Sequence, residues 1–155
     1  MAFRSIVARS AALCRRAMAT EASGNTFPLT FGSPYKAIYD NSNVKQVDLP
    51  STTGHFGILP QHVPTIAILV PGTVSIHTES GEVEKYFVSS GTATIHADSS
   101  VQILAEEICA VADIDENAVR SGLEAAQSKL SSASNEADKA AAQIEVDVYQ
   151  SMMAA

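Results

Sequence analysis

The chain has 155 residues, of which 46% are hydrophobic and 17% charged, with a formal net charge of −7. This length allows one compact domain with a small appendage, and the composition is typical of a folded chain. The negative charge argues against nucleic acid as a partner, and no apolar stretch approaches the ~20 residues that span a bilayer, so we expect a soluble or peripheral protein.

The first 18 residues differ in kind from the rest. No acidic residue precedes Glu21, and alanine, serine and helix-spaced apolar residues surround four arginines: Arg4, Arg9, Arg15 and Arg16. This composition is typical of a mitochondrial transit peptide, although a basic tail that stays on the protein is an alternative. We predict cleavage after Met18, which lowers the formal charge to about −11 and leaves 19–25 as a flexible N-terminus. Cys109 then stands alone, so no internal disulfide is expected.

Residues 26–112 alternate between short apolar segments and turn signals. The alternation predicts many short strands, hence an antiparallel β-sandwich or flattened barrel. A turn cluster at Asp40–Asn43 separates the second and third segments. The predicted strands cover residues 27–31, 35–39, 44–49, 66–70, 74–78, 83–88, 93–97 and 101–105.

Residues 113–155 change to a helical period. Asp113 and Asp115 are candidate N-caps for a first helix. Two apolar stripes at offsets of 0, 4, 7 and 11 predict an antiparallel two-helix hairpin. The stripes are Val119, Leu123, Ala126 and Leu130, then Ala137, Ala141, Ile144 and Val148. We assign hairpin packing to Val119, Leu123, Leu130, Ile144 and Val148.

The segment from Gly54 to Gly72, GHFGILPQHVPTIAILVPG, joins two predicted strands. Gly54 and Gly57 bracket His55-Phe56, a pattern that predicts a tight, exposed turn. Phe56 at its tip either tucks under the sheet or contacts a partner. The following residues shape a rigid loop because prolines force extended backbone before them. They are Pro60, His62, Pro64, Pro71 and Gly72.

The sequence shows no signature of catalysis, cofactor binding or metal binding. It contains no phosphate-binding loop, no dinucleotide fingerprint and no serine-nucleophile elbow. None of the histidines has the close spacing of a zinc motif. A cupin-like barrel that brings His62, His77 and His96 together remains an alternative. It would make the chain a stand-alone matrix enzyme or ligand-binding module.

Several motifs resemble the delta/epsilon subunits of F-type ATP synthases, a family of mitochondrial delta and bacterial or chloroplast epsilon chains. The strongest is G-x-x-G-I-L-P-x-H-x-P, which begins at Gly54. Others are Lys45–Pro50, Lys85–Gly91, Ala97–Gln102 and Leu104–Glu107. The resemblance runs from Thr26 to the C-terminus and is weaker in the helices.

The resemblance implies a non-catalytic subunit of the central stalk, on the matrix side of the mitochondrial inner membrane. The family links the gamma subunit to the c-ring and transmits the rotation that couples proton flow to ATP synthesis. In mitochondria a small epsilon subunit also attaches, and we expect it to contact the hairpin. Gly54, His55, Phe56 and Gly57 would form a docking loop at the c-ring.

One motif of the family is missing from the start of the first predicted helix. Some bacterial relatives bind ATP through I/L-D-x-x-R-A. Here Ile114-Asp115 is followed by Glu116 and Asn117, and the nearest arginine, Arg120, is displaced along the helix. We therefore expect no nucleotide binding.

Overall fold

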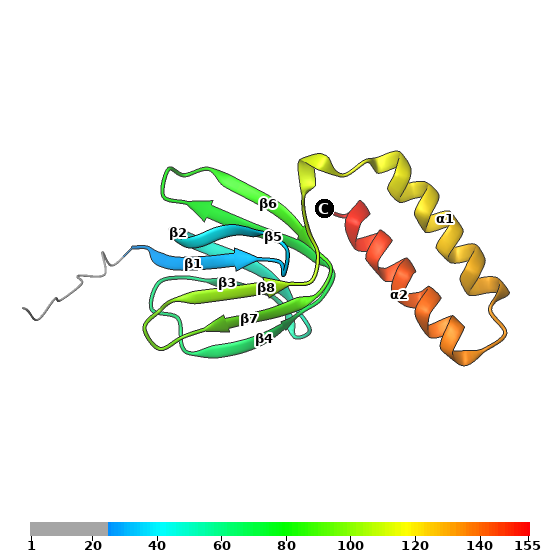
Figure 1. Cartoon of the computed structure of the whole chain (residues 1–155), viewed down its shortest axis with the longest axis horizontal. Helices are drawn as coiled ribbons and strands as arrows, with labels where there is room; N and C mark the ends of the chain where they lie inside the picture. The colour runs from blue at the N-terminus through cyan, green and yellow to red at the C-terminus, as the bar shows by residue number, and fades with distance from the viewer. Residues whose placement is uncertain (1–24) are drawn as a thin grey trace, which may run out of the picture.

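A computed structural model describes residues 25–155, which form a β-sandwich followed by two helices (Figure 1). The predicted fold class is thus confirmed, whereas the predicted transit peptide lies outside the described residues. The strands are β1 Phe27–Gly32, β2 Ala37–Ser51, β3 Gly54–Ile58, β4 Thr65–Leu69, β5 Gly72–Thr78, β6 Val83–Val88, β7 Gly91–Ile95, β8 Val101–Ala105 and β9 Ile108–Ala110. A 3-10 turn, η1 Val111–Asp113, leads to helices α1 Glu116–Ser132 and α2 Glu136–Met153.

The strands form two layers that meet along both sides. One layer has the order β1-β8-β7-β4, and the other contains β3, β2, β5, β6 and β9. At one side β1 pairs with β2, and at the other β4 pairs with β2 between Leu69 and Ser51. All pairs are antiparallel except β1 with β8, which is parallel. The layers are thus joined by strand pairing along both sides and form a flattened barrel, instead of only facing each other.

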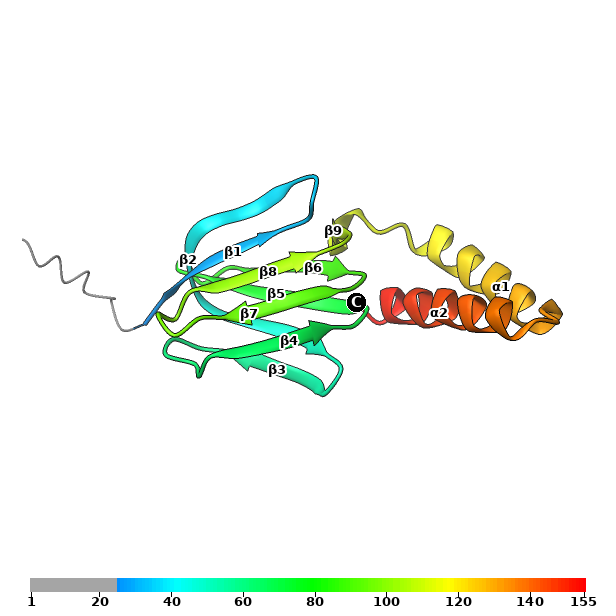
Figure 2. The ribbon, with the colours of Figure 1, turned by 60° about the horizontal axis from the view of Figure 1, so that its bottom comes forward.

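Strand β2 takes part in both layers because it bends. Its first half pairs with β1 and its second half with β5 and β3 (Figure 2). The predicted turn at Asp40–Asn43 is wrong. Asn41 instead has a φ of 50° in a β-bulge opposite β1, and another register shift follows Val44. Asparagine tolerates this left-handed conformation, so a turn-like sequence here bends a strand without ending it.

Alternating side chains of the strands fill the space between the layers. The largest fully buried side chains come from six strands, as the period of two requires. They are Phe27, Leu29, Phe31, Val44, Val47, Leu49, Ile58, Val74, Ile76, Val88, Val101 and Ile103. The sandwich therefore has one continuous apolar core.

The helical hairpin follows the predicted pattern in α1 but not in α2. Asp115 caps α1, accepting hydrogen bonds from the amides of Asn117 and Ala118 at 2.9 and 3.4 Å. Of the predicted α1 stripe, Val119 and Ala126 are buried, and Leu123 and Leu130 are half-buried.

In α2 the buried residues are Ala142 and Val146. The packing role predicted for Ile144 is wrong, since its side chain is 63% exposed. Val148 is half-buried, as Leu123 and Leu130 are. α2 carries apolar residues on two opposite sides, so the helical period alone does not say which side meets α1.

The hairpin projects from one end of the sandwich, where it meets β5 and β6 (Figures 1 and 2). α2 contacts β5, and η1 contacts β6. Phe87 is 2% exposed, yet it lies outside the sandwich core, because its partners Thr73 and Cys109 place it on the outer face. The sandwich thus buries one aromatic residue outside its core, on the layer that η1 and α2 contact.

Candidate docking surfaces

Within residues 25–155 no three His, Cys, Asp or Glu side chains lie close enough together to hold a metal ion. The three histidines of the cupin-like alternative have separate surroundings. His62 Nδ1 lies 2.9 Å from the carbonyl of Val63, His77 Nε2 lies 3.1 Å from Asp48 Oδ2, and His96 is exposed. No helix in this part of the chain is long and apolar enough to cross a membrane.

The tight turn predicted at Gly54–Gly57 is wrong, because these residues belong to β3. The turn itself is Thr52-Thr53, and Gly54 leaves it with a φ of 117°. Gly57 lies opposite Asp48, where an added Cβ would be 2.7 Å from Asp48 Oδ1. Gly54 therefore provides the positive φ at the end of the turn, and Gly57 allows β3 to approach Asp48 of β2 closely. The two glycines do not bracket a turn.

Phe56 and His55 point to opposite sides of β3. Phe56 pairs with buried Leu49, is half-buried and packs against the core, with its ring centroid 6.3 Å from that of His62. His55 pairs with Pro50 and is exposed. Phe56 is thus the tucked residue of the two, and His55 is the exposed one.

The loop from Leu59 to Pro64 lies at the end of the sandwich away from the hairpin (Figures 1 and 2). The amide of His62 donates to the carbonyl of Leu59 at 3.2 Å, and Gln61 has a φ of 62°. Leu59 and Val63 are 56% and 69% exposed. Beside the loop, a groove of about 360 Å³ between β3 and β4 is lined by Phe56, His62, Ile66 and Ile68, with threonines at its rim. The loop is thus compact and carries apolar side chains outward.

The outer face of the β1-β8-β7-β4 layer carries no charge across two complete rows. The register places Gly32, Leu104, Thr92 and Ile68 in one row and Thr30, Gln102, Thr94 and Ile66 in the other. Ile66 and Ile68 are 74% and 62% exposed, and Leu104 is 54% exposed. We call these eight residues the uncharged face. Monomeric proteins rarely leave such apolar side chains grouped in water, so this face is a candidate interface.

The opposite layer presents a different outer surface. There Gln46 Nε2 donates to Asp48 Oδ1 at 2.7 Å, the other oxygen of Asp48 meets His77, and Lys85 is exposed. The contrast shows that the absence of charge is particular to one side of the sandwich. The sequence held a signal for it: residues 66–69 are apolar at both strand phases, which predicts a strand covered on both faces.

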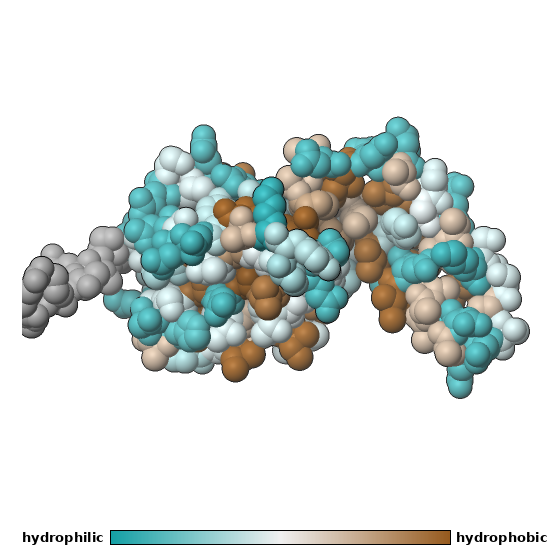
Figure 3. Space-filling model, viewed as in Figure 1, coloured by the Kyte–Doolittle hydropathy of each residue, from teal (hydrophilic) through white to brown (hydrophobic). Residues whose placement is uncertain are grey.

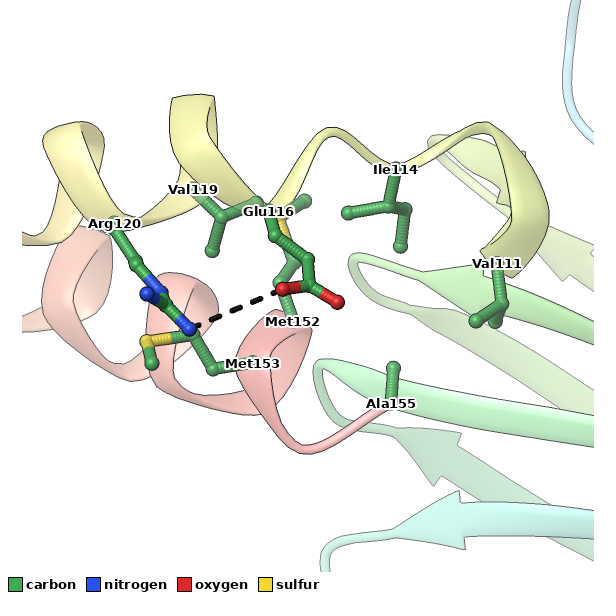
Figure 4. A pocket seen from close by; sticks show the side chains of 8 residues that line it. All are labelled: Val111, Ile114, Glu116, Val119, Arg120, Met152, Met153 and Ala155. Atoms are coloured by element: carbon green, nitrogen blue, oxygen red, sulfur yellow. Dashed lines mark ion pairs between the residues drawn. The ribbon is translucent and has the colours of Figure 1, made fainter.

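A small pocket of about 200 Å³ lies where α1 begins and α2 ends (Figure 4). Ile114, Val119 and Met152 form its apolar wall. Glu116 and Arg120 form an exposed ion pair at 3.9 Å, so the arginine of this pocket already faces a carboxylate. This is a poor phosphate site, because a bound phosphate would compete with Glu116 for Arg120 and be repelled by that carboxylate.

Comparison with known proteins decides the family. A family model for the beta-sandwich domain of the ATP synthase delta/epsilon chain matches residues 26–111, and one for the C-terminal domain of metazoan delta subunits of F1F0-ATP synthase matches residues 114–155. The chain belongs to the delta/epsilon family of ATP synthase subunits. As a mitochondrial delta subunit it is a non-catalytic part of an enzyme complex, which decides against the stand-alone enzyme.

Relatives within the delta/epsilon family cover most of the chain. The mitochondrial delta subunit of Caenorhabditis elegans is 45% identical over 90% of this chain and 85% of its own length. That of Yarrowia lipolytica is 39% identical over 90% and 86%. A chain of the Euglena gracilis mitochondrial ATP synthase structure, titled OSCP/F1/c-ring, has the same fold: TM-score 0.79, 24% identity, 84% of this chain and 81% of that one.

Proposed function

We propose that this delta subunit links the gamma subunit to the c-ring in the rotor of the mitochondrial ATP synthase, on the matrix side of the inner membrane. Its share of the work is mechanical: it transmits rotation that couples proton flow to ATP synthesis. The uncharged face carries this proposal. It gives the sandwich a broad side that is suited to a permanent partner, and we assign that side to gamma.

A second contact is assigned to the c-ring. β3 pairs only with β2 among the described strands, so its other edge is free. That edge carries exposed His55, and the loop beyond it carries exposed Leu59 and Val63. We place the c-ring contact on this edge and loop, with Phe56 as its internal support. Gly54–Gly57 would then contact the c-ring as part of an edge strand and not as a turn.

The third contact is assigned to the mitochondrial epsilon subunit and the hairpin. Ile144 is exposed on the side of α2 that faces away from α1. Figure 3 shows brown, apolar side chains along the edge of the hairpin that borders the notch beside the sandwich. A helix with apolar residues on two sides needs a second neighbour. We assign that neighbour to the epsilon subunit.

The proposal is tested with one charge placed on each side of the sandwich. Ile68→Asp puts a carboxylate on the uncharged face, and Val83→Asp makes the matched change at a 50% exposed valine of the opposite layer. Both positions are exposed, so the isolated variants should melt like the wild type. In native gels of mitochondrial membranes, Ile68→Asp should leave the synthase and Val83→Asp should co-migrate with it. Equal behaviour of the two variants would contradict the assignment of this face.

A further inference from the structure

The turn between β1 and β2 carries Tyr35, the most exposed of the large hydrophobic side chains in the described part of the chain. Tyr35 is 88% exposed, more than Ile66 or Val63. Neither the core nor the three contacts proposed above use it. Tyrosine supplies a large, rigid contact area with a polar tip, and it is enriched among the residues that dominate interface energies. Whether Tyr35 contributes to an interface depends on where this turn lies.

The turn is closed by hydrogen bonds and lies beside the uncharged face. The amide of Ser33 donates to the carbonyl of Lys36 at 2.8 Å, and the amide of Lys36 donates to Ser33 Oγ at 3.2 Å. Gly32 pairs with Leu104, so a Cβ on Gly32 would point outward as Leu104 does. That Cβ would lie 2.9 Å from the carbonyl oxygen of Lys36. The turn backbone therefore crosses the outward side of Gly32, at the end of one row of the uncharged face.

A hydrogen-bonded cluster holds the β1–β2 strand pair that carries this turn. Tyr39 Oη and Tyr86 Oη both donate to Glu84 Oε2, at 2.8 and 2.7 Å. Tyr39 belongs to β2 and the other two residues to β6, and these strands do not pair with each other. The ring of Tyr86 also packs edge-on against Phe31 of β1, with centroids 5.6 Å apart. The first half of β2, which stands clear of the sandwich in Figure 2, is thus tied to β6.

We propose that Tyr35 is an anchor residue for the partner that covers the uncharged face. Its ring enters an apolar recess of that partner, with a hydrogen-bond acceptor at the end of the recess for the hydroxyl. The closed turn and the Tyr39–Glu84–Tyr86 cluster fix the β1–β2 strand pair before binding. Little conformational entropy is therefore lost when the partner docks. The identity of the partner, the gamma subunit, rests on the function proposed above.

Titration of the full-length chain into an F1 subcomplex that contains gamma but lacks this subunit tests the anchor. Tyr35→Ala should raise Kd by roughly 30-fold or more, as truncation of an anchor does. Tyr35→Phe keeps the ring and should raise Kd less. Val83→Ala, an exposed apolar truncation on the opposite layer, should change Kd by less than about twofold. The melting temperature of free Tyr35→Ala should equal that of the wild type.

Each outcome separates the anchor from the proposed function. If Ile68→Asp abolishes binding while Tyr35→Ala binds like the wild type, the anchor is wrong and the uncharged face keeps its partner. If neither change weakens binding, both proposals fail. If Val83→Ala weakens binding as much as Tyr35→Ala, the effect is not specific to the turn and the anchor is again wrong. Tyr39→Phe, which removes one hydrogen bond of the cluster, should weaken binding while Tyr35 is intact.

Discussion

The ring of Tyr149 in α2 lies directly against the backbone of Gly122 in α1. A Cβ placed on Gly122 would be 2.5 Å from both Cε1 and Cζ of that ring, closer than two carbon atoms can approach without a shift. The glycine therefore sets the distance between the two helices at this level and selects the side of α2 that faces α1.

Gly122→Ala should destabilise the hairpin. Alanine is a better helix former by ~1 kcal/mol, but overpacking against Tyr149 costs about 1–3 kcal/mol. Hydrogen exchange of the α1 and α2 amides should become faster in the variant. Ser128→Ala, at an exposed position of the same helix, is the control: it gains helix propensity with no ring against it, so its exchange should not become faster. If Gly122→Ala slows exchange, the tight contact with Tyr149 is refuted.

Phe56→Ala and His55→Ala should separate the internal from the docking role of β3. Phe56 is half-buried against the core, so its truncation should cost the isolated subunit about 1–3 kcal/mol, less than the ~3–5 kcal/mol of a fully buried ring. His55→Ala should melt like the wild type and weaken coupling in the assembled synthase. Chemical denaturation of the isolated subunit measures the stability of both variants, and proton-leak measurements on the assembled synthase test the coupling of His55→Ala. Wild-type stability of Phe56→Ala would show that the ring does not support the core.

These two glycine-containing segments show how far sequence reasoning reaches. The strand period and the α1 stripe follow from local patterns, because apolar residues must share a face to be buried. The side of α2 that packs against α1 does not follow from the local pattern, because Ile144 and Val146 lie on opposite sides of a helix that is apolar on both sides. Gly54–Gly57 resembles a turn locally, yet pairing with β2 makes it a strand, and only the register reveals that Gly57 opposes Asp48. The uncharged face likewise depends on four strands brought together by the fold.

Stability should fall at alkaline pH because of the tyrosine cluster. Burial, then the hydrogen bond and charge of Glu84, raise the pKa of Tyr86 to about 12 and push that of Tyr39 up in the same way. In the unfolded chain a tyrosine ionises near pH 10. The stabilisation is therefore complete below about pH 10 and is lost as the pH rises through about 12.

Urea unfolding of the wild type between about pH 9 and pH 12 checks this dependence. Tyr86→Phe removes one ionising group from the cluster, so its unfolding free energy should fall less steeply over the same range. Tyr35→Phe is the matched control, because Tyr35 is exposed and lies outside the cluster. Parallel curves for the wild type and Tyr86→Phe would contradict the assignment.

ATP should not bind specifically to the isolated subunit at millimolar concentration. The pocket at the start of α1 offers Arg120, which faces Glu116, and the arginine position of the bacterial motif is filled by Ala118. Isothermal calorimetry with ATP should give no saturable heat. A saturable heat that Arg120→Ala abolishes would show that this pocket recognises nucleotide.

In the assembled synthase, the uncharged face should meet the gamma subunit. Photo-crosslinking tests it most directly, with a benzophenone amino acid at position 68 and, as the control, at position 83 of the opposite layer. In intact mitochondrial membranes, position 68 should give an adduct with the gamma subunit and position 83 should not. An adduct with gamma from position 83 alone, or none from either, would show that the uncharged face does not meet gamma.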